Sequence, residues 1–364
     1  MSQEVSSINE LEELYRHSTT RKLTFLGFMF ILLIVIALVA TASGVAGISV
    51  TDVARVILNK LIPGLHLATA SDLAETIVME LRLPRVILAM LTGLSLAGAG
   101  AVMQGVLRNP LVSPYTLGLS SGASLGAAIA MVLGASVFGN MYVVAGKYII
   151  VVNAFVFGSI TMLLVYGIAK IKDTVPETLI LAGVALGYLF QAGVSALKYF
   201  SDHEALKDLV VWLMGGLWGA SWNTVSILLP IVMICLALLE RYAWDLNALG
   251  SGEEMAISLG VKVDRLRLVT LGLATLMASS TIAFTGIIGF IGLVAPHVCR
   301  FIIGSDNRFL LPGSALTGAV LLLLADTLAR LVLAPVEIPV GIITSLIGAP
   351  FFIYLLLKAK RQLW

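Results

Sequence analysis

One short motif in the chain has the residue types and spacing of a hydrolase nucleophile. The pattern G-x-S-x-G presents a reactive serine on a strand-to-helix turn, and it is matched by Gly118-Leu119-Ser120-Ser121-Gly122. The surrounding residues favour another role, because Gly118, Gly122 and Gly126 recur every four positions, as on a helix that packs closely against its neighbour. Of the four histidines, only His297 lies near membrane depth. We therefore expect helix packing here rather than an intramembrane hydrolase.

Other common chemistries find little support in the sequence. The phosphate-binding pattern G-x-x-x-x-G-K-[ST] is absent, so we expect the chain not to hydrolyse ATP alone, and we predict no catalytic residue. The two cysteines, Cys235 and Cys299, fall in separate apolar segments. Buried thiols of this kind are mostly inert small hydrophobes, so we predict neither a disulfide nor a metal site. The net charge of +2 implies no nucleic-acid partner.

The composition places the chain in a lipid bilayer. Hydrophobic residues make up 59% of the 364 residues, charged residues only 12%, and the mean hydropathy is +1.01. So much apolar surface does not fit inside one aqueous core. Only helices and closed barrels satisfy their backbone in lipid, and continuous apolar runs favour helices. The predicted fold class is an all-α, polytopic membrane protein.

Apolar runs long enough to cross a bilayer recur along the chain. The nine expected crossings are Leu23–Ala42, Pro84–Val106, Thr116–Phe138, Val143–Ala169, Thr178–Leu197, Val225–Glu240, Leu268–Ile291, Phe309–Val332 and Val340–Leu357. A shorter tenth crossing is expected at Gly292–Ile303, because nine would leave the termini on opposite sides. Most Lys and Arg residues fall on the side that would carry both termini, so the positive-inside rule places both in the cytoplasm.

The chain divides into a short tail and one membrane domain. Residues 1–22 are acidic and lack the basic start of a secretory signal, so we expect a cytoplasmic amino-terminal tail. Residues 23–364 form the transmembrane domain. Within it, the predicted fifth crossing is thin and polar enough to line a water-filled path, because it carries Gly183, Gly187, Gln191 and Ser195.

A cytoplasmic segment between the sixth and seventh crossings is suited to protein docking. Two short helices are expected at about 244–261, separated by Gly250 and Gly252 and stopped by Gly260. Their apolar edge contains Met255, Ile257 and Leu259. An exposed apolar edge on short helices suits a groove on another protein better than a plain connecting loop would require.

Several long motifs, in order, resemble the permease family of ABC importers for vitamin B12, iron siderophores and haem. In the first half, the resemblance rests on Arg82-Leu83-Pro84-Arg85, Gly98–Gly105 and Asn109-Pro110-Leu111. In the second half, it rests on Gly289–His297 with Arg300, Leu311-Pro312-Gly313, Ala325-Asp326 with Ala329-Arg330, Ile338–Thr344 and Gly348–Phe351. The match runs from about Leu81 to Leu357.

The resemblance implies a complete transport assembly. This subunit would have ten helices and pair with a second copy of itself, with the path between the two copies. Two ATP-binding cytoplasmic subunits would hold ATP and Mg²⁺, so this chain would bind no cofactor. An extracellular or periplasmic substrate-binding protein would deliver a metal-chelate substrate to this subunit, which would carry it across the cell (cytoplasmic) membrane.

The same resemblance assigns roles to individual residues. Docking of the binding protein would use Arg82, Arg85 and Arg330, whose planar guanidinium groups suit carboxylate partners. A cytoplasmic gate would use Asn109 and Leu111. In the vitamin B12 member of the family, the second part of this gate is small and hydroxylated, whereas this chain has Val175-Pro176-Glu177 there. Coupling to the ATPase would use Leu249, Gly250, Gly252, Glu253, Glu254, Met255, Ala256, Leu259 and Gly260.

The cargo and one alternative function stay open at this point. An iron siderophore is the first expectation, with cobalamin or haem behind it. The alternative is a secondary transporter or channel, which usually places ionisable residues at mid-membrane. Asp326 is the main acidic candidate within a predicted crossing, but Arg330 lies four residues further on. A helical ion pair explains both residues without a proton relay.

Overall fold

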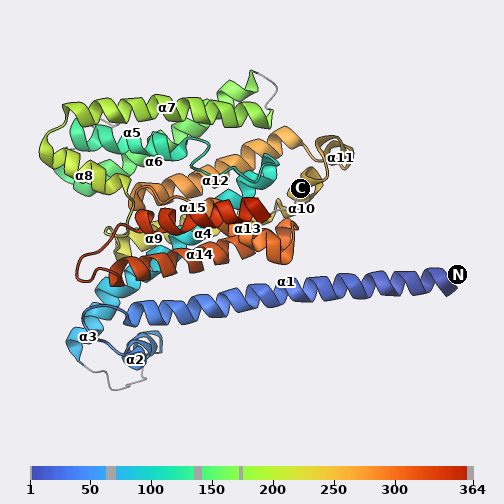
Figure 1. The fold of residues 1–364 in the computed structure, drawn as a ribbon, viewed down its shortest axis with the longest axis horizontal. Coiled ribbons are helices and arrows are strands. Elements are labelled where there is room, and N and C mark those ends of the chain that lie inside the picture. Colours follow the sequence, from blue (N-terminus) through green and yellow to red (C-terminus); the bar gives the residue numbers. More distant parts are fainter. Residues whose placement is uncertain (1, 63–70, 135–141, 172–174, 359–364) are drawn as a thin grey trace.

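The fold consists of helices joined by short connections (Figure 1). The computed structural model describes residues 2–62, 71–134, 142–171 and 175–358, and these contain no β-strand. Its helices are α1 Ser2–Ala42, α2 Val50–Leu61, α3 Asp72–Thr76, the π-helical segment η1 Ile77–Arg82, α4 Leu83–Val106, α5 Leu119–Val132, α6 Tyr142–Lys170, α7 Pro176–Phe200, α8 His203–Leu213, α9 Trp222–Glu240, α10 Ala243–Gly250, α11 Glu253–Ser258, α12 Val263–Thr285, α13 Ile291–Ile303, α14 Asn307–Leu331 and α15 Val340–Lys358.

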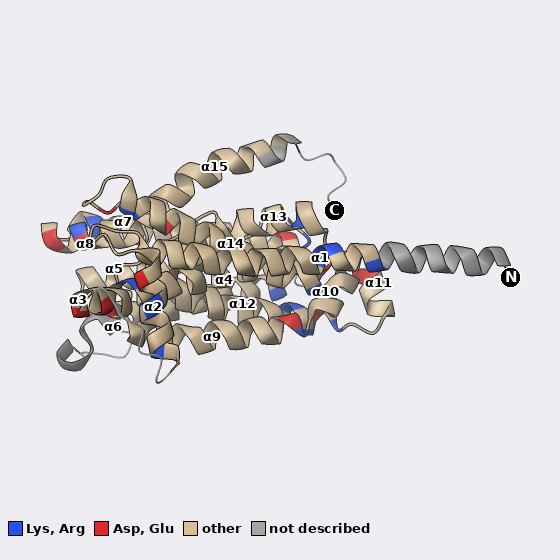
Figure 2. Ribbon diagram, turned by 90° about the horizontal axis from the view of Figure 1, so that it is seen from below, with Lys and Arg blue, Asp and Glu red and all other residues tan. Residues whose placement is uncertain are grey.

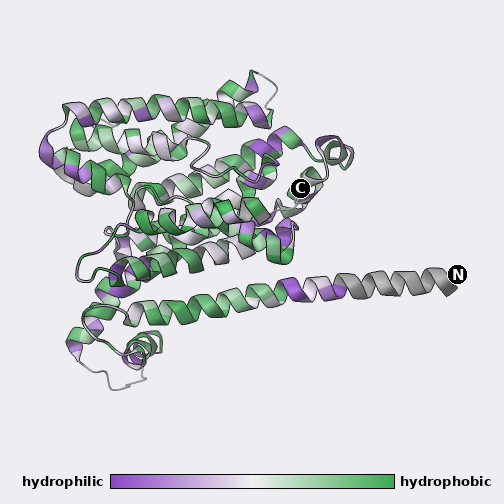
Figure 3. Ribbon diagram, in the orientation of Figure 1, coloured by the Kyte–Doolittle hydropathy of each residue, from purple (hydrophilic) through white to green (hydrophobic). Residues whose placement is uncertain are grey.

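The predicted all-α membrane fold is confirmed. Among the described residues, 7 helices are long and apolar enough to cross a membrane, and three shorter apolar helices accompany them at Leu119–Val132, Ile291–Ile303 and Val340–Tyr354. The count of ten crossings stays a prediction. Charged residues collect at the two ends of the bundle and leave its middle apolar (Figures 2 and 3). This distribution is the one that a hydrocarbon layer around the middle requires.

Helix α4 forms the centre of the bundle. Helices α9, α12, α13 and α14 pack around it, and α1 lies along the outer side of α14 (Figure 1). Helices α5, α6, α7 and α8 form a second group, which joins the first through contacts of α5 and α6 with α12. Helix α1 begins, and α15 ends, toward the end of the bundle that carries α10 and α11 (Figure 1). The cytoplasmic placement of that end stays a prediction.

Several boundaries differ from those expected from hydropathy. The first crossing is continuous with the tail, because α1 runs unbroken through Ser2–Ala42. The expected crossing at 116–138 narrows to α5, which has 14 residues, and residues 135–138 lie outside the described part of the chain. The expected crossing at 268–291 ends early at Thr285, because Gly286 adopts a positive φ of 67° and breaks the helix before α13 begins. Helices α2 and α8 were not expected, although Ser49 and Asp202 cap their first turns.

Glycines let the central helices approach at backbone distance. A Cβ on Gly100 of α4 would overlap the carbonyl oxygen of Gly292 on α13, and one on Gly93 would overlap that of Gly318 on α14. The glycines of the G-x-S-x-G motif behave in the same way. A Cβ on Gly122 of α5 would overlap the Thr161 side chain of α6. The packing role predicted for this motif is therefore confirmed.

This packing predicts that two glycine-to-alanine substitutions differ strongly in their effect on the stability of the protein. Gly100→Ala should destabilise the protein by about 1–3 kcal/mol, because the new methyl group forces α4 and α13 apart. The matched control is Gly272→Ala in α12, where the new Cβ meets no atom within 4 Å and alanine favours the helix. Thermal unfolding in detergent measures both. Equal melting temperatures for the two variants would contradict the close α4–α13 contact.

Candidate functional sites

Two of the three predicted docking arginines, Arg85 and Arg330, bind one buried carboxylate. The side chain of Asp326 on α14 is fully buried. Arg85 of α4 donates to its Oδ1 from Nε at 3.1 Å and from Nη2 at 3.0 Å. Arg330 donates from Nε to Oδ2 at 3.0 Å, which is the i,i+4 pair expected from the sequence. Both carboxylate oxygens are thus used, so Asp326 fixes α4 and α14 to each other.

Arg330 and the third docking arginine, Arg82, hold the end of α1. Arg82 donates from Nη1 to the carbonyl oxygens of Thr41 at 3.0 Å and Ala42 at 2.7 Å. Arg330 donates to the carbonyl oxygens of Ser43 at 3.3 Å and Ala40 at 3.2 Å. The last carbonyls of a helix have no partner within the helix, and cations near them are favourable. Arg82 and Arg330 therefore cap α1 from the side of the bundle.

Glu337, in the connection between α14 and α15, completes the cluster. Arg85 donates from Nη1 to its Oε1 at 3.0 Å and to its Oε2 at 2.8 Å. Neither Glu337 nor the contact between Arg85 and Asp326 was predicted from the sequence. The presence of Arg85 in a predicted membrane crossing was a signal for such contacts, because arginines at membrane depth need carboxylate or carbonyl partners. Binding-protein docking by Arg82, Arg85 and Arg330 stays a prediction.

The predicted coupling segment forms two short helices, α10 and α11. Gly252 and Gly260 adopt φ values of 127° and 87°, which suit the turns that bound α11. Leu249 and Ala256 are buried beneath the segment. Met255, Ile257 and Leu259 are exposed by 53%, 59% and 66%. The exposed apolar edge expected from the sequence is confirmed, and Glu254 lies beside it on the surface with Gly250 at the end of α10.

Glu253 fixes α11 to the membrane helices. Its two oxygens accept from Nη1 and Nη2 of Arg267 on α12, at 3.2 Å and 2.7 Å. The Arg267 side chain is only 2% exposed, so its charge depends on this partner. Of the predicted coupling residues, Glu253 thus has a positioning role within the chain.

Asp306, at the first turn of α14, ties α10 and α1 to the same point. Its carboxylate accepts from Asn247 of α10 at 2.8 Å, from Arg308 at 2.7 Å and from Lys22 of α1 at 3.4 Å. Burial alone would raise the pKa of Asp306, but the hydrogen bonds from Arg308 and Asn247 outweigh it and hold the pKa well below its ordinary value. Arg308 also stacks on Trp244, 4.1 Å from the ring centroid. A movement of α10 therefore acts directly on α14.

The predicted gate residues lie in the turn between α4 and α5. Asn109 accepts a hydrogen bond from the backbone N–H of Leu111 at 2.9 Å, which shapes the turn. The Leu111 side chain is 47% exposed. Val175, at the start of α7, is also exposed. The gating role of Asn109 and Leu111 stays a prediction.

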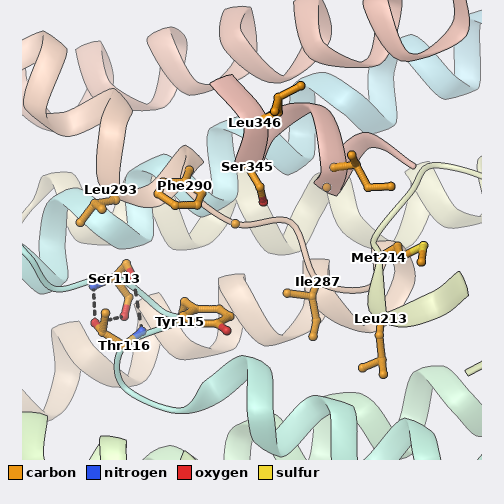
Figure 4. Close-up of a pocket in the computed structure, with 13 residues that line it drawn as sticks. Ser113, Tyr115, Thr116, Leu213, Met214, Ile287, Phe290, Leu293, Ser345 and Leu346 are labelled. Atoms are coloured by element: carbon orange, nitrogen blue, oxygen red, sulfur yellow. Dashed lines mark hydrogen bonds between the residues drawn. The ribbon is translucent and has the colours of Figure 1, made fainter. Parts of the chain in front are cut away.

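A cavity of about 880 Å³ opens beyond this turn (Figure 4). Its walls come from the turn before α5, the end of α8, the break between α12 and α13, and the start of α15. The lining residues are Ser113, Tyr115, Thr116, Leu213, Met214, Ile287, Gly289, Phe290, Leu293, Gly341, Ile342, Ser345 and Leu346. None of these described residues carries a charge. Such a wall offers weak contacts to a solute and no strong binding group.

The predicted path residues on α7 divide between two environments. Gly183 is buried, and a Cβ there would lie 2.8 Å from the Leu117 backbone, so this glycine packs α7 against the turn before α5. Gly187 is half-buried near Ser121. Gln191 and Ser195 are exposed in the single chain. Their path-lining role stays a prediction.

Comparison with known proteins decides the family. The model of the FecCD transport family matches residues 30–358, which is nearly the whole chain. The chain belongs to the FecCD transport family. It is therefore a membrane permease of the ABC transporter type, as the sequence motifs predicted.

Relatives and a solved structure support this assignment over most of the chain. The Fe(3+)-citrate import system permease protein YfmE of Bacillus subtilis is 42% identical, over 79% of this chain and 84% of that protein. The cobalamin import system permease protein BtuC of Halobacterium salinarum is 44% identical, over 81% of this chain and 79% of that protein. A metal-chelate type ABC transporter in an inward-facing conformation superposes with a TM-score of 0.77 at 33% identity, covering 92% of this chain and 99% of that one.

The buried carboxylate of the arginine cluster predicts a specific loss of stability. Asp326→Asn should cost about 3–5 kcal/mol, because it leaves Arg85 and Arg330 without their shared charge partner. Asp208→Asn on α8 is the matched control, since Asp208 is an exposed carboxylate elsewhere in the chain. Thermal unfolding of the two variants in detergent compares them. A melting temperature for Asp326→Asn equal to that of Asp208→Asn would show that the cluster contributes nothing to stability.

Proposed function

We propose that this FecCD permease imports a metal chelate into the cytoplasm, with an iron siderophore as the first candidate and cobalamin or haem behind it. Separate ATPase subunits drive it from the α10–α11 end, and a binding protein delivers the cargo at the arginine cluster. The uncharged cavity is the observation that supports the proposal most directly. A wall without charges lets a bulky chelate pass, whereas a fixed ionic site would retain it.

A second copy of the chain completes the path. Gln191 and Ser195 lie on an exposed face of α7, which also presents Tyr188 and Leu189. A polar amide facing lipid is costly, so the face needs cover from protein or from a water-filled space. A homodimer with the path between its subunits would cover this face partly with the second subunit and partly with the water-filled path. Gly183 and Gly187 then position α7 beside that path.

The α11 edge explains how a separate ATPase acts on this chain. The exposed side chains of Met255 and Leu259 enter a groove of the ATPase subunit, while Glu253 and Asn247 transmit its movement to α12 and α14. Alternating access follows if ATP and the loaded binding protein favour different arrangements of the same helices. ATP and Mg²⁺ stay on the ATPase subunits.

The coupling assignment predicts the failure of one assembly step. Met255→Asp combined with Leu259→Asp places two charges in a desolvated groove, which costs several kcal/mol and should abolish co-purification of the ATPase. ATP-dependent uptake into proteoliposomes should fall to background, measured with ferric siderophore and with cobalamin as separate cargoes. Met255→Leu combined with Leu259→Met keeps the edge apolar and should retain both properties. Normal uptake by the aspartate variant would refute the coupling assignment.

The docking assignment predicts a charge-dependent loss of affinity. Arg85→Glu should weaken binding of the cognate substrate-binding protein to the nanodisc-embedded transporter, most strongly at low salt, because an attraction becomes a repulsion. Arg55→Glu on α2 is the matched control for the same charge change on an exposed arginine. An affinity for Arg85→Glu equal to that of Arg55→Glu at two ionic strengths would remove Arg85 from the docking surface.

A further inference from the structure

Arg85 differs from the other two arginines of the cluster in the kind of partner it holds. Arg82 and Arg330 donate to carbonyl oxygens at the end of α1, and Arg330 also holds the buried Asp326. These partners belong to the packed bundle. Arg85 holds Asp326 on one side and Glu337 on the other, and the side chain of Glu337 is 37% exposed. Only this second partner can leave without unpacking a helix.

The contact between Arg85 and Glu337 is a complete charge-assisted recognition of a carboxylate. Both oxygens of Glu337 lie within 3.0 Å of Nη1. The connection that carries Glu337 is exposed from Leu331 onward, and the backbone N–H of Ile338 donates to the carbonyl oxygen of Ala329 at 3.1 Å. That bond keeps the backbone beside α14 while the Glu337 side chain faces the water at the surface. The carboxylate is therefore presented at the arginine but is not buried there.

Asp326 keeps Arg85 in place whether or not Glu337 is bound. It accepts from Nε and Nη2, which leaves Nη1 as the group directed to the exposed side. The guanidinium therefore needs no reorganisation when its outer partner changes. A preorganised donor of this kind loses little entropy on binding a new carboxylate.

We propose that Glu337 occupies, in the free permease, the position that a carboxylate of the binding protein takes on docking. The inference rests on the proposed docking function of Arg85 and adds the residue that competes for it. Docking is then an exchange, in which the partner's carboxylate takes over Nη1 of Arg85 and Glu337 moves into water. The three arginines and two carboxylates of the cluster leave one positive charge, which attracts the incoming carboxylate, and the exchange of one carboxylate for another keeps that charge unchanged.

This exchange predicts that removal of a negative charge improves binding. Glu337→Gln should tighten the affinity of the cognate binding protein for the nanodisc-embedded transporter about five-fold, the scale of one exposed charge pair. The gain should shrink at high salt. Glu80→Gln is the matched control, because Glu80 is an exposed carboxylate two residues before Arg82. Glu337→Ala repeats the test without a side-chain amide.

The outcomes separate this inference from the docking function itself. Tighter binding by both Glu337 variants but not by Glu80→Gln supports the exchange. Unchanged or weaker binding by the Glu337 variants, together with a loss in Arg85→Glu, overturns the exchange and keeps docking at Arg85. Affinities that stay unchanged in all of these variants, Arg85→Glu included, overturn the docking function. Equal gains for Glu337→Gln and Glu80→Gln would show a general effect of surface charge and would also refute the exchange.

Discussion

Burial of the Asp326 carboxylate is the constraint on which one end of the helix bundle depends. A lone charge at this depth would be prohibitively costly, so two arginines from different helices must stay beside it. Once they do, their remaining donors point at the nearest acceptors, which are the last carbonyls of α1 and the side chain of Glu337. The position of α1 and the direction of Arg85 are therefore both consequences of one ion pair.

The sequence was sufficient for features that depend on local composition. Apolar runs predict the helices, glycines at 250, 252 and 260 predict the turns around α11, and the spacing of Asp326 and Arg330 predicts their ion pair. In each case, the residues that predict the feature lie within a few positions of the helix, turn or ion pair that they form. The family motifs add the permease function, because their order along the chain matches a known arrangement.

Features that depend on contacts across the fold could not be predicted in the same way. Arg85 and Glu337 are separated by 252 residues, and only the packing of α4 against α14 brings them together. Hydropathy also failed where a single glycine conformation outweighs an apolar run, as at Gly286, where the helix ends although the residues that follow are apolar. Gly183 is a similar case. The sequence predicts that it lines a water-filled path, whereas in the fold it packs closely against the backbone of Leu117.

Helices α4 and α14 both contact α10 near one end and carry residues of the arginine cluster near the other. Asp306 begins α14 at the α10 end, and Asp326 lies 20 residues further along the same helix, roughly 30 Å away at the rise of an α-helix. Each carboxylate binds a neighbouring element, Asn247 of α10 at one end and Arg85 of α4 at the other. Glycines bring α4 and α14 into backbone contact between these points, so the pair has little freedom to bend or slide. A displacement of α10 is therefore transmitted along this pair as a rigid-body movement that reaches the arginine cluster.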